Sequence, residues 1–485
     1  MHERAVANPT TSAARDTARI VLSGIAIAIL IVVFYPRIEQ AARSGHYLIQ
    51  ISLVAAMPLL FIACYCIGFS TAAAARRELT VAVIVAAAFI MAAGLTIWPY
   101  RGADVWTYVS YGWMQVRYHM SPYGHEMVEV PGYAHDPMLT TSEFEELFPY
   151  GPLFAEFAKL VCRLSGANPL HAVFLFKLAN LAAAVAIAAL AASVAAHLGT
   201  ERRVVVVYLF LCHPLIALEF IGEGHNDLLA AAPVVLAIFL AQRGWLMLVL
   251  PAIAIGALVK FLPVLAAPFA FAYVARRRGA RAALASAALA ATICVLAAAP
   301  YLIGWTVPIV RRTVSVQFGS YQSLPCSIAY IAVKTIRLTA LSAVRKPARV
   351  YEVVAALGAL AYAAFFTARC LSFARKPMPQ LEELIAAITL VLIVLICLAR
   401  SKYDAWYAGE FLPIALMLGR RHWLSRAAIA ISFAGLLEFV LDQYWLPIVD
   451  LALLIGIPLA WAWWSAPSEL SAGSPRLKPD GGLFR

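Results

Sequence analysis

Residues 79–98 read LTVAVIVAAAFIMAAGLTIW, twenty positions without a single charged side chain. A helix needs about 20 apolar residues to cross the hydrocarbon core of a bilayer, so this run predicts a transmembrane span. Two earlier runs, 20–36 and 47–69, have the same character. The first of them follows a polar segment of nineteen residues and is not followed by a small-residue cleavage site. We therefore interpret it as a span and not as a signal peptide.

The composition of the chain extends this pattern. Of its 485 residues, 63% are hydrophobic and 13% are charged, whereas a soluble domain has about 25% charged residues. The net charge is +12, but the Lys and Arg residues lie mostly in short loops between apolar runs, as the positive-inside rule describes. We therefore predict membrane lipids as partners and no nucleic acid. The eight cysteines lack zinc spacing and mostly lie in apolar runs, which indicates core residues, not disulfides.

Charges between the apolar runs predict the topology. Arginines in the segment 1–19 place the N-terminus in the cytoplasm, and the third span then leads to an outer loop at 99–150, in the periplasm of a bacterium with two membranes. Eleven later runs continue the alternation: 169–197, 204–221, 228–242, 244–259, 261–275, 281–300, 350–369, 382–400, 407–420, 425–441 and 446–464. We predict an all-α polytopic protein of the inner (cytoplasmic) membrane, with one domain at 20–464 and about 12–14 transmembrane helices.

Two segments near the C-terminus need separate interpretation. A second long outer loop is expected at 301–349, and its part 326–344 is apolar but carries Lys334 and Arg337. We interpret this part as an amphipathic helix at the membrane surface; if it spans instead, every later loop changes side. The tail 465–485 is polar and rich in Pro and Gly, and we expect it to be cytoplasmic and disordered.

The first outer loop opens with a group of residues that could carry chemistry. Residues 101–108 read RGADVWTY, which places Asp104 among aromatic residues, close to Arg101 and only a few positions beyond a span. A carboxylate at this depth would meet the head group of an amphiphilic substrate. The alternative is an aromatic belt at the membrane interface, with an ordinary loop aspartate.

The short loop at 223–227 holds a second group, Glu-Gly-His-Asn-Asp, between two apolar runs. A turn followed by a helix N-cap would explain Asn226 or Asp227. Two acids and a histidine exceed what capping needs, and polar groups at membrane depth tend to be functional. Glu223, His225 and Asp227 match no specific metal-binding spacing, so we predict no metal site.

The third group consists of cations assigned to the outer face. Lys260 interrupts a long apolar stretch, where an ammonium must reach the interface or meet an anion. The anion could be a substrate phosphate or a protein carboxylate such as Glu223. Further cations on this face are Arg311, Arg312, Arg400 and Lys402. No Asp-x-Asp pair and no Gly-rich phosphate loop occurs in the chain, which argues against a nucleotide-sugar donor.

Taken together, these residues resemble the GT-C superfamily of membrane glycosyltransferases. The likeness covers about residues 80–420 and rests on Asp104 after an early span, followed by four strings: Ser121-Pro122-Tyr123, Tyr150-Gly151-Pro152, Gly224-His225-Asn226-Asp227 and Lys260-Phe261-Leu262-Pro263. Within that superfamily the chain is similar to glycosyltransferase family 87 and to polyprenol-phosphate-mannose-dependent α-mannosyltransferases. The resemblance implies a GT-C helical bundle, a polyprenyl-phosphate sugar as donor, a loop aspartate as base and no cofactor or obligatory metal.

The chemistry of such a transfer assigns roles to the residues. One displacement with inversion needs a base for the acceptor hydroxyl and cations for the departing phosphate. We expect Asp104 to be the base, with Asp227 as the next candidate. Candidate phosphate partners are Lys260, Arg311, Arg312 and Lys402. Candidate substrate-binding residues are Arg101, Trp106, Tyr108, Tyr111, Tyr150, Glu223, His225 and Asn226. Of these, we expect Trp106, Tyr108 and Tyr111 to stack on sugar faces. We expect His225 and Asn226, with Asp227, to form a polar wall that binds a sugar or the reacting hydroxyl.

The predicted function is transfer of a hexose, expected to be mannose, to a lipid or glycan acceptor on the outer face of the membrane. A transporter or flippase of lipid-linked sugars is one alternative, although it predicts paired inverted repeats, and we find no clear pairing in the sequence. A polymerase or ligase of lipid-linked saccharides is another, and it would share the outer-face site.

Overall fold

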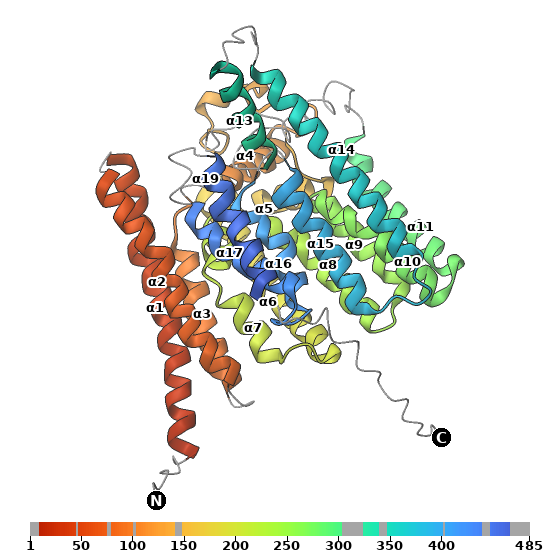
Figure 1. Ribbon diagram of the computed structural model, residues 1–485. Helices are drawn as coiled ribbons and strands as arrows, with labels where there is room; N and C mark the ends of the chain where they lie inside the picture. The colour runs from red at the N-terminus through yellow and green to blue at the C-terminus, as the bar shows by residue number, and fades with distance from the viewer. Residues whose placement is uncertain are drawn as a thin grey trace, which may run out of the picture.

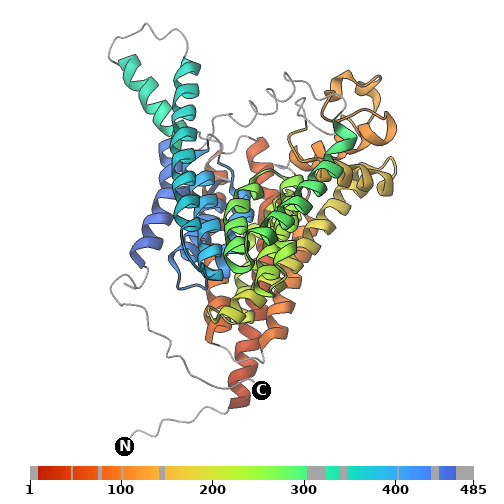
Figure 2. The same ribbon diagram turned by 90° about the vertical axis from the view of Figure 1, so that its right-hand side faces the viewer.

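A computed structural model of the chain describes residues 9–44, 47–74, 79–99, 103–140, 148–302, 324–338, 347–400, 403–438 and 447–465. It is 84% helical, with no strand among those residues. The helices form one bundle in which the described N-terminal and C-terminal helices run roughly parallel to the others (Figures 1 and 2). The predicted all-α polytopic class is therefore confirmed.

The first three helices stand together at one side of the bundle, on the left of Figure 1: α1 Pro9–Ser44, α2 Tyr47–Ala74 and α3 Thr80–Thr96. Small residues allow their close approach. A Cβ added to Gly24 of α1 would lie only 2.6 Å from the side chain of Ala86 in α3. Helix α1 begins eleven residues before the run at 20–36, because polar residues of the predicted N-terminal segment continue the helix.

The outer loop predicted at 99–150 is not a simple loop. It contains the helix α4 Ala103–Arg117 and two short turns, η2 Met127–Glu129 and η3 Tyr133–His135, and α5 Pro152–Ser165 follows it. Tyr108 of α4 and Phe154 of α5 meet edge to face, with ring centroids 4.7 Å apart. Asp136 accepts hydrogen bonds from Trp113 and Tyr118, both 2.8 Å long, and the second raises the pKa of the Tyr118 hydroxyl. These contacts fix α4 above the bundle.

The remaining helices follow the predicted runs closely. The middle of the chain contains α6 Pro169–Leu198, α7 Arg203–Leu211, η4 Ile216–Gly222, α8 Asp227–Gln242, η5 Leu246–Leu248, α9 Val249–Val259, η6 Leu262–Ala266, α10 Ala267–Arg278, α11 Ala280–Ala298 and η7 Ala299–Tyr301. The C-terminal part contains α13 Leu324–Leu338, α14 Pro347–Ala374, α15 Leu381–Ile393, η8 Val394–Ala399, η9 Ala405–Tyr407, α16 Ala408–Leu416, α17 Trp423–Ala434, η10 Gly435–Leu437, α19 Pro447–Leu451, η11 Ala452–Gly456 and α20 Ile457–Ser465.

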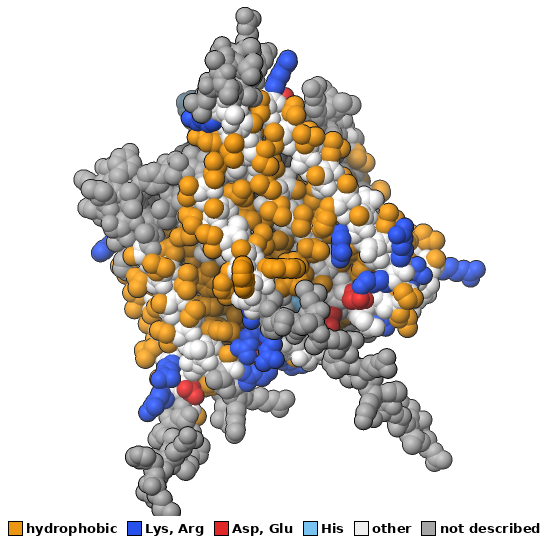
Figure 3. All heavy atoms as spheres, in the orientation of Figure 1, with side chains coloured by type: hydrophobic (Ala, Val, Ile, Leu, Met, Phe, Trp, Pro, Cys, Tyr) orange, Lys and Arg blue, Asp and Glu red, His pale blue; other side chains and the backbone are white. Residues whose placement is uncertain are grey.

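Six helices among the described residues are long and apolar enough to cross a membrane, and five further apolar helices are shorter. Helix α7 and the π-helical turn η4 pass the same test as one span that is bent by 62°. The lateral surface in Figure 3 is largely hydrophobic, and Lys and Arg side chains gather toward its lower and right-hand edges. The chain is thus multi-pass, while the predicted number of 12–14 spans stays a prediction.

Loops assigned to the cytoplasm by their charge meet in the structure. Arg202 donates to the carbonyl oxygen of Ala73, and Arg420 Nε lies 3.1 Å from Oε2 of Glu201. Arg276 donates to the carbonyl oxygen of Ala374 over 2.7 Å. Each contact joins two loops that the predicted alternation of spans places on a common side, while the side of the membrane on which they lie stays a prediction.

The described residues test only part of two predictions for the C-terminal half. A helix is present at Leu324–Leu338, which covers the greater part of the segment 326–344 that is expected to lie at the membrane surface, and it packs on α14. Its place at that surface stays a prediction, and positions 339–344 and the tail from position 466 lie outside the described residues. The seven described cysteines are free thiols, in line with the expected absence of a disulfide framework.

Candidate active site

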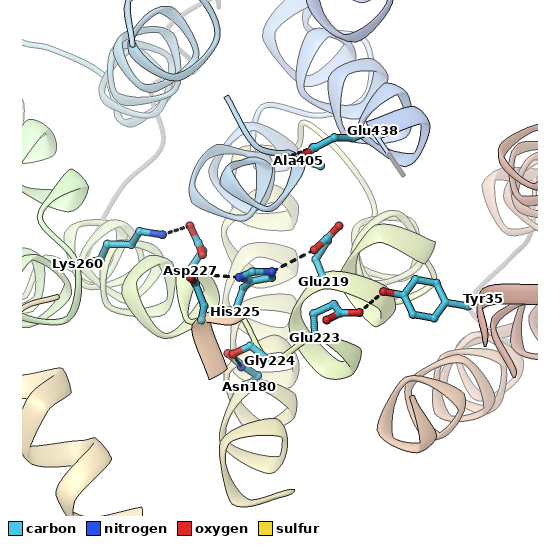
Figure 4. Close-up of polar contacts among 11 residues, drawn as sticks. Tyr35, Asn180, Glu219, Glu223, Gly224, His225, Asp227, Lys260, Ala405 and Glu438 are labelled. Atoms are coloured by element: carbon cyan, nitrogen blue, oxygen red, sulfur yellow. Dashed lines mark hydrogen bonds and ion pairs between the residues drawn. The ribbon is translucent and has the colours of Figure 1, made fainter. Parts of the chain in front are cut away.

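Four separate parts of the chain converge on one polar cluster, which we call the Asp104 cluster: Asp104, Glu219, His225, Asp227, Lys260, Arg400, Trp406, Tyr407 and Glu410. They come from the start of α4, from η4 and the turn that joins it to α8, from the end of α9, and from the segment that runs from Arg400 into α16. Figure 4 shows His225, Asp227 and Lys260 on one side of that turn. The structure thus brings together five residues that were predicted on the outer face: Asp104, His225, Asp227, Lys260 and Arg400.

The turn itself depends on backbone geometry that the sequence encodes. The N–H groups of Glu223 and His225 donate to the carbonyl oxygens of Leu218 and Glu219, over 2.8 and 3.1 Å, and so close the π-helical turn η4. Gly224 has φ +86°, in the left-handed region that favours glycine. A Cβ there would lie 3.0 Å from the side chain of Val105, next to Asp104. The glycine thus allows the turn to lie directly against α4.

His225 connects the turn to the predicted base. Its Nδ1 lies 3.3 Å from Oδ2 of Asp104, and its Nε2 lies 3.4 Å from Oε2 of Glu219. The indole of Trp406 stacks on the imidazole, with centroids 4.1 Å apart and planes 11° apart. The His225 side chain is 1% exposed, whereas that of Asp104 is 28% exposed. Of these two residues, Asp104 is therefore the one that a substrate can reach.

Asp227 is the partner of Lys260. The Lys260 Nζ donates to Oδ1 of Asp227 over 2.6 Å. The sequence had left open a substrate phosphate or Glu223 as partners, and Glu223 is not the carboxylate used. Asn226 occupies the N-cap position of α8, as the helix-cap interpretation expected, but its side chain makes no capping hydrogen bond. Asp227 therefore contributes charge to the cluster instead of capping the helix.

An aromatic ring lies against both cations of the cluster. The Tyr407 ring centroid is 4.9 Å from Lys260 Nζ and 4.1 Å from Arg400 Cζ. The carboxyl group of Glu410 is buried and interacts electrostatically with Asp227, Lys260 and Arg400. Two cations from distant segments thus meet at one ring, with carboxylates beside them.

Sequence reasoning did not select Glu219, Trp406, Tyr407 or Glu410. A signal was present for the two acids, because each interrupts a run predicted to span the membrane. No comparable signal marks Trp406 or Tyr407, since aromatic residues beside a span are ordinary interface residues. Only the folded chain shows that these rings cover His225 and the cations.

The motif Tyr150-Gly151-Pro152 lies beside the end of α9. The Gly151 N–H donates to the carbonyl oxygen of Val259 over 3.0 Å, and a Cβ on Gly151 would lie 2.1 Å from the Leu258 carbonyl oxygen. The glycine therefore permits backbone contact one residue before Lys260. The Tyr150 hydroxyl interacts electrostatically with Asp104, so this motif lies beside both the predicted base and the backbone segment that carries the cation.

Two of the three residues predicted to stack on a sugar have other positions, while the role of the third, Trp106, stays a prediction. Tyr108 and Tyr111 are fully buried and pack against Phe154 and Phe148, respectively. Neither ring offers a face to a sugar, so their predicted role is corrected to support of α4. Trp106 is partly buried, and its Nε1 donates to the carbonyl oxygen of Pro99 over 3.3 Å.

Glu223 and Asn226, two further candidate substrate-binding residues, are both buried. Glu223 is buried and accepts a hydrogen bond from Tyr35 of α1. In Figure 4 it points away from Lys260, toward that tyrosine. Asn226 is fully buried, and its side-chain amide has no hydrogen-bond partner among the described residues. Glu223 is therefore removed from the candidate substrate-binding residues.

Four predicted binding residues, Arg101, Arg311, Arg312 and Lys402, lie outside the described residues. Within the described part of the chain, no group of three or more His, Cys, Asp or Glu side chains could hold a metal ion. The candidate machinery therefore consists of Asp104 with its supporting residues and of the cations Lys260 and Arg400.

Comparison with known proteins adds a family to this geometry. Residues 20–276 match the family model of the MptA/B family, described as the N-terminal domain of alpha-(1->6)-mannopyranosyltransferase. The match covers just over half of the chain and includes Asp104, the turn at 223–227 and Lys260. No curated protein and no solved structure matches the chain. The resemblance to membrane mannosyltransferases is confirmed, while the closer likeness to glycosyltransferase family 87 stays a prediction. The chain belongs to the MptA/B family of alpha-(1->6)-mannopyranosyltransferases and is a multi-pass membrane mannosyltransferase.

Proposed function

We propose that the enzyme transfers mannose from a polyprenyl-phosphate donor to a hydroxyl of a glycan or lipid acceptor, on the outer face of the inner membrane and with inversion. The observation that carries this proposal is the composition of the Asp104 cluster. A solvent-accessible carboxylate lies on the same side of the turn as two cations that converge on Tyr407. A one-step displacement of a phosphate leaving group requires that combination of base and cations.

The proposed step begins with Asp104. Its carboxylate takes the proton of the acceptor hydroxyl while the hydroxyl oxygen forms a bond to the anomeric carbon of mannose. The bond from that carbon to the phosphate oxygen breaks on the opposite face of the sugar, and polyprenyl phosphate leaves with the electron pair. A single base is enough, because the leaving phosphate needs no proton at neutral pH; a second carboxylate of the glycosidase kind is not required.

Lys260 and Arg400 are the proposed ligands of the donor phosphate. An ammonium group has three N–H donors, and the contact with Asp227 occupies one of them. The guanidinium of Arg400 reaches the same ring of Tyr407 from another segment. A phosphate placed between the two cations would accept from both, and the charge-assisted hydrogen bonds would strengthen as negative charge develops on the leaving group.

The surface beside Lys260 is suited to the lipid part of the donor. Phe261 is 50% exposed and Val264 is 53% exposed, although both are large apolar residues. They lie one and four residues after Lys260 in the chain, so an isoprenoid chain in the bilayer can contact them while its phosphate reaches the lysine. The apolar contact area would contribute about 25 cal/mol per Å² of buried surface.

The family description indicates the acceptor chemistry. An alpha-(1->6) linkage requires a primary 6-hydroxyl group as nucleophile, and we propose that the acceptor presents such a group to Asp104. A primary hydroxyl extends from its sugar ring and reaches a carboxylate at the surface more easily than a ring hydroxyl does.

A donor panel tests the function. Purified enzyme in lipid nanodiscs is given polyprenyl-phosphate mannose, polyprenyl-phosphate glucose or GDP-mannose, each with a short alpha-(1->6) mannan acceptor. We expect elongation of the acceptor and release of polyprenyl phosphate with the first donor, and unchanged rates after addition of EDTA. Transfer from GDP-mannose alone would overturn the proposed donor. Movement of the lipid across liposomes without release of phosphate would identify a flippase, and transfer of whole oligosaccharides a polymerase.

A further inference from the structure

His225 is held on three sides by residues from three different elements. Asp104 of α4 lies at its Nδ1, Glu219 of η4 at its Nε2, and the ring of Trp406 covers its face at 4.1 Å. Asp227 also acts on it electrostatically. Because the side chain is 1% exposed, the imidazole is shielded from a substrate and can influence the reaction through the residues around it.

The two nitrogen contacts define what the ring can do. An imidazolium carries an N–H on both nitrogens and so suits a position between two carboxylates. The 3.3 Å contact with Oδ2 limits the rotation of the Asp104 carboxylate. Glu219 is buried and lies at the opposite end of the ring. The arrangement repeats a general design, in which a buried carboxylate orients a histidine that in turn supports the reacting group.

Trp406 controls the plane of that histidine. Its indole is nearly parallel to the imidazole, with 11° between the planes. Stacked rings prefer such offset contacts, and a ring held on one face loses freedom to rotate. Trp406 stands in η9, between Arg400 and Glu410, and outside the family match at 20–276. The family model therefore gives no role to this residue.

We propose that Trp406 and His225 are positioning residues for the general base. Trp406 fixes the plane of His225, the carboxylate of Glu219 lies 3.4 Å from its far nitrogen, and His225 holds the carboxylate of Asp104 in the orientation that accepts the acceptor proton. The proposal rests on the proposed function, since it assumes that Asp104 is the base. It adds that the C-terminal part of the chain completes the catalytic geometry, through a side chain that does not touch the substrate.

Two substitutions of Trp406 separate stacking from packing. Trp406→Phe keeps an aromatic face, and Trp406→Met keeps apolar bulk without one. We expect Trp406→Met to lower kcat about tenfold, because small displacements of a catalytic group are costly, while KM for the donor stays within about twofold. Trp406→Phe should keep most of kcat. Trp423→Met is the matched control, because Trp423 stacks on His422, with centroids 6.4 Å apart, in a different part of the molecule.

A double-mutant cycle shows whether Trp406 acts through His225. His225→Gln should lower kcat at least as much as Trp406→Met, and Trp406→Met in the His225→Gln background should add almost nothing. Equal losses in both backgrounds would overturn the proposal, and so would a kcat for Trp406→Met like that of the Trp423→Met control. If Trp406→Met does not fold, as judged by thermal unfolding in nanodiscs, Trp406→Leu takes its place in the cycle. Failure of the proposed function would show earlier, as absence of transfer by the unsubstituted enzyme.

Discussion

The two sides of one short turn differ in what their polar residues contact. On one side, Glu223 accepts a hydrogen bond from Tyr35 of α1 and interacts electrostatically with the buried Lys177. On the other side, His225 and Asp227 contact Asp104 and Lys260. Figure 4 shows the divergence directly. Within five residues, the chain therefore supplies a contact that connects helices and also two residues of the candidate active site.

This difference shows that membrane depth alone does not mark a catalytic residue. Polar residues in apolar surroundings are costly and must find partners, but the partner decides the role. Lys177 donates to the carbonyl oxygen of Ile97 at the end of α3, so the Glu223 side connects α1, α3 and α6. The other side of the turn has a carboxylate in reach of solvent, that of Asp104. Each prediction below separates the two sides further.

The largest effect is expected at Asp104. Asp104→Asn keeps the shape of the side chain and removes the basic charge, so transfer should fall about 10²- to 10⁴-fold. The amount of folded enzyme should be unchanged. The rate of polyprenyl phosphate release measures the effect. Asp16→Asn is the control, because Asp16 lies near the start of α1 and outside the Asp104 cluster. Normal turnover by Asp104→Asn would make Asp227 the next candidate base.

A smaller loss is expected at the cation on the same side of the turn. Lys260→Met retains the apolar stem and deletes the charge, so donor binding should weaken about 10- to 100-fold, the value of a hydrogen bond to a charged group. Fluorescence quenching with a labelled polyprenyl phosphate measures the affinity. Lys159→Met is the control, because Lys159 also pairs with a carboxylate, at 3.5 Å from Glu156. Equal affinities for Lys260→Met and the parent would make Lys260 a structural partner of Asp227.

Much of the fold could be predicted from the sequence, because apolar runs of about 20 residues have few alternatives to helical spans. The run at 169–197 corresponds to α6 Pro169–Leu198, and the run at 79–98 to α3 Thr80–Thr96. The helix α4 inside the predicted outer loop was missed. Its residues alternate between large aromatic and polar types, which is typical of an interface segment as much as of a helix.

The candidate site could be predicted only where a polar residue stands out from its neighbours. Asp104, His225, Asp227 and Lys260 did so, and the structure brings these four together. The direction of each side chain could not be predicted. Glu223 and His225 are two residues apart, and the left-handed Gly224 between them sends them to opposite sides. Tyr108 and Tyr111 were similarly assigned to sugars, although the helix turns them into an aromatic core.

The backbone contact at Gly151 tests the side of the site that contains Lys260, with a smaller expected effect. Gly151→Ala places a methyl group 2.1 Å from the Leu258 carbonyl oxygen, so the end of α9 must shift. We expect a loss of about 1–3 kcal/mol in stability, as for overpacked positions, and weaker donor binding than in the parent, but stronger than in Lys260→Met. Gly124→Ala is the control, because its nearest neighbour is 4.0 Å away. Unchanged donor affinity would show that Lys260 is insensitive to this contact.

The smallest effect is expected on the far side of the turn. Tyr35→Phe removes the hydroxyl that donates to Glu223 and leaves a buried carboxylate with one donor fewer. Hydrogen bonds between membrane helices contribute about 1 kcal/mol each, so the unfolding free energy in mixed micelles should fall by about that amount. Because Tyr35 contacts neither Asp104 nor Lys260, kcat and donor affinity per folded molecule should stay at the parent values. A loss of kcat in folded Tyr35→Phe enzyme, comparable to that of His225→Gln, would mean that both sides of the turn act on the reaction. That result would contradict the separate roles of the Glu223 side and the His225 side.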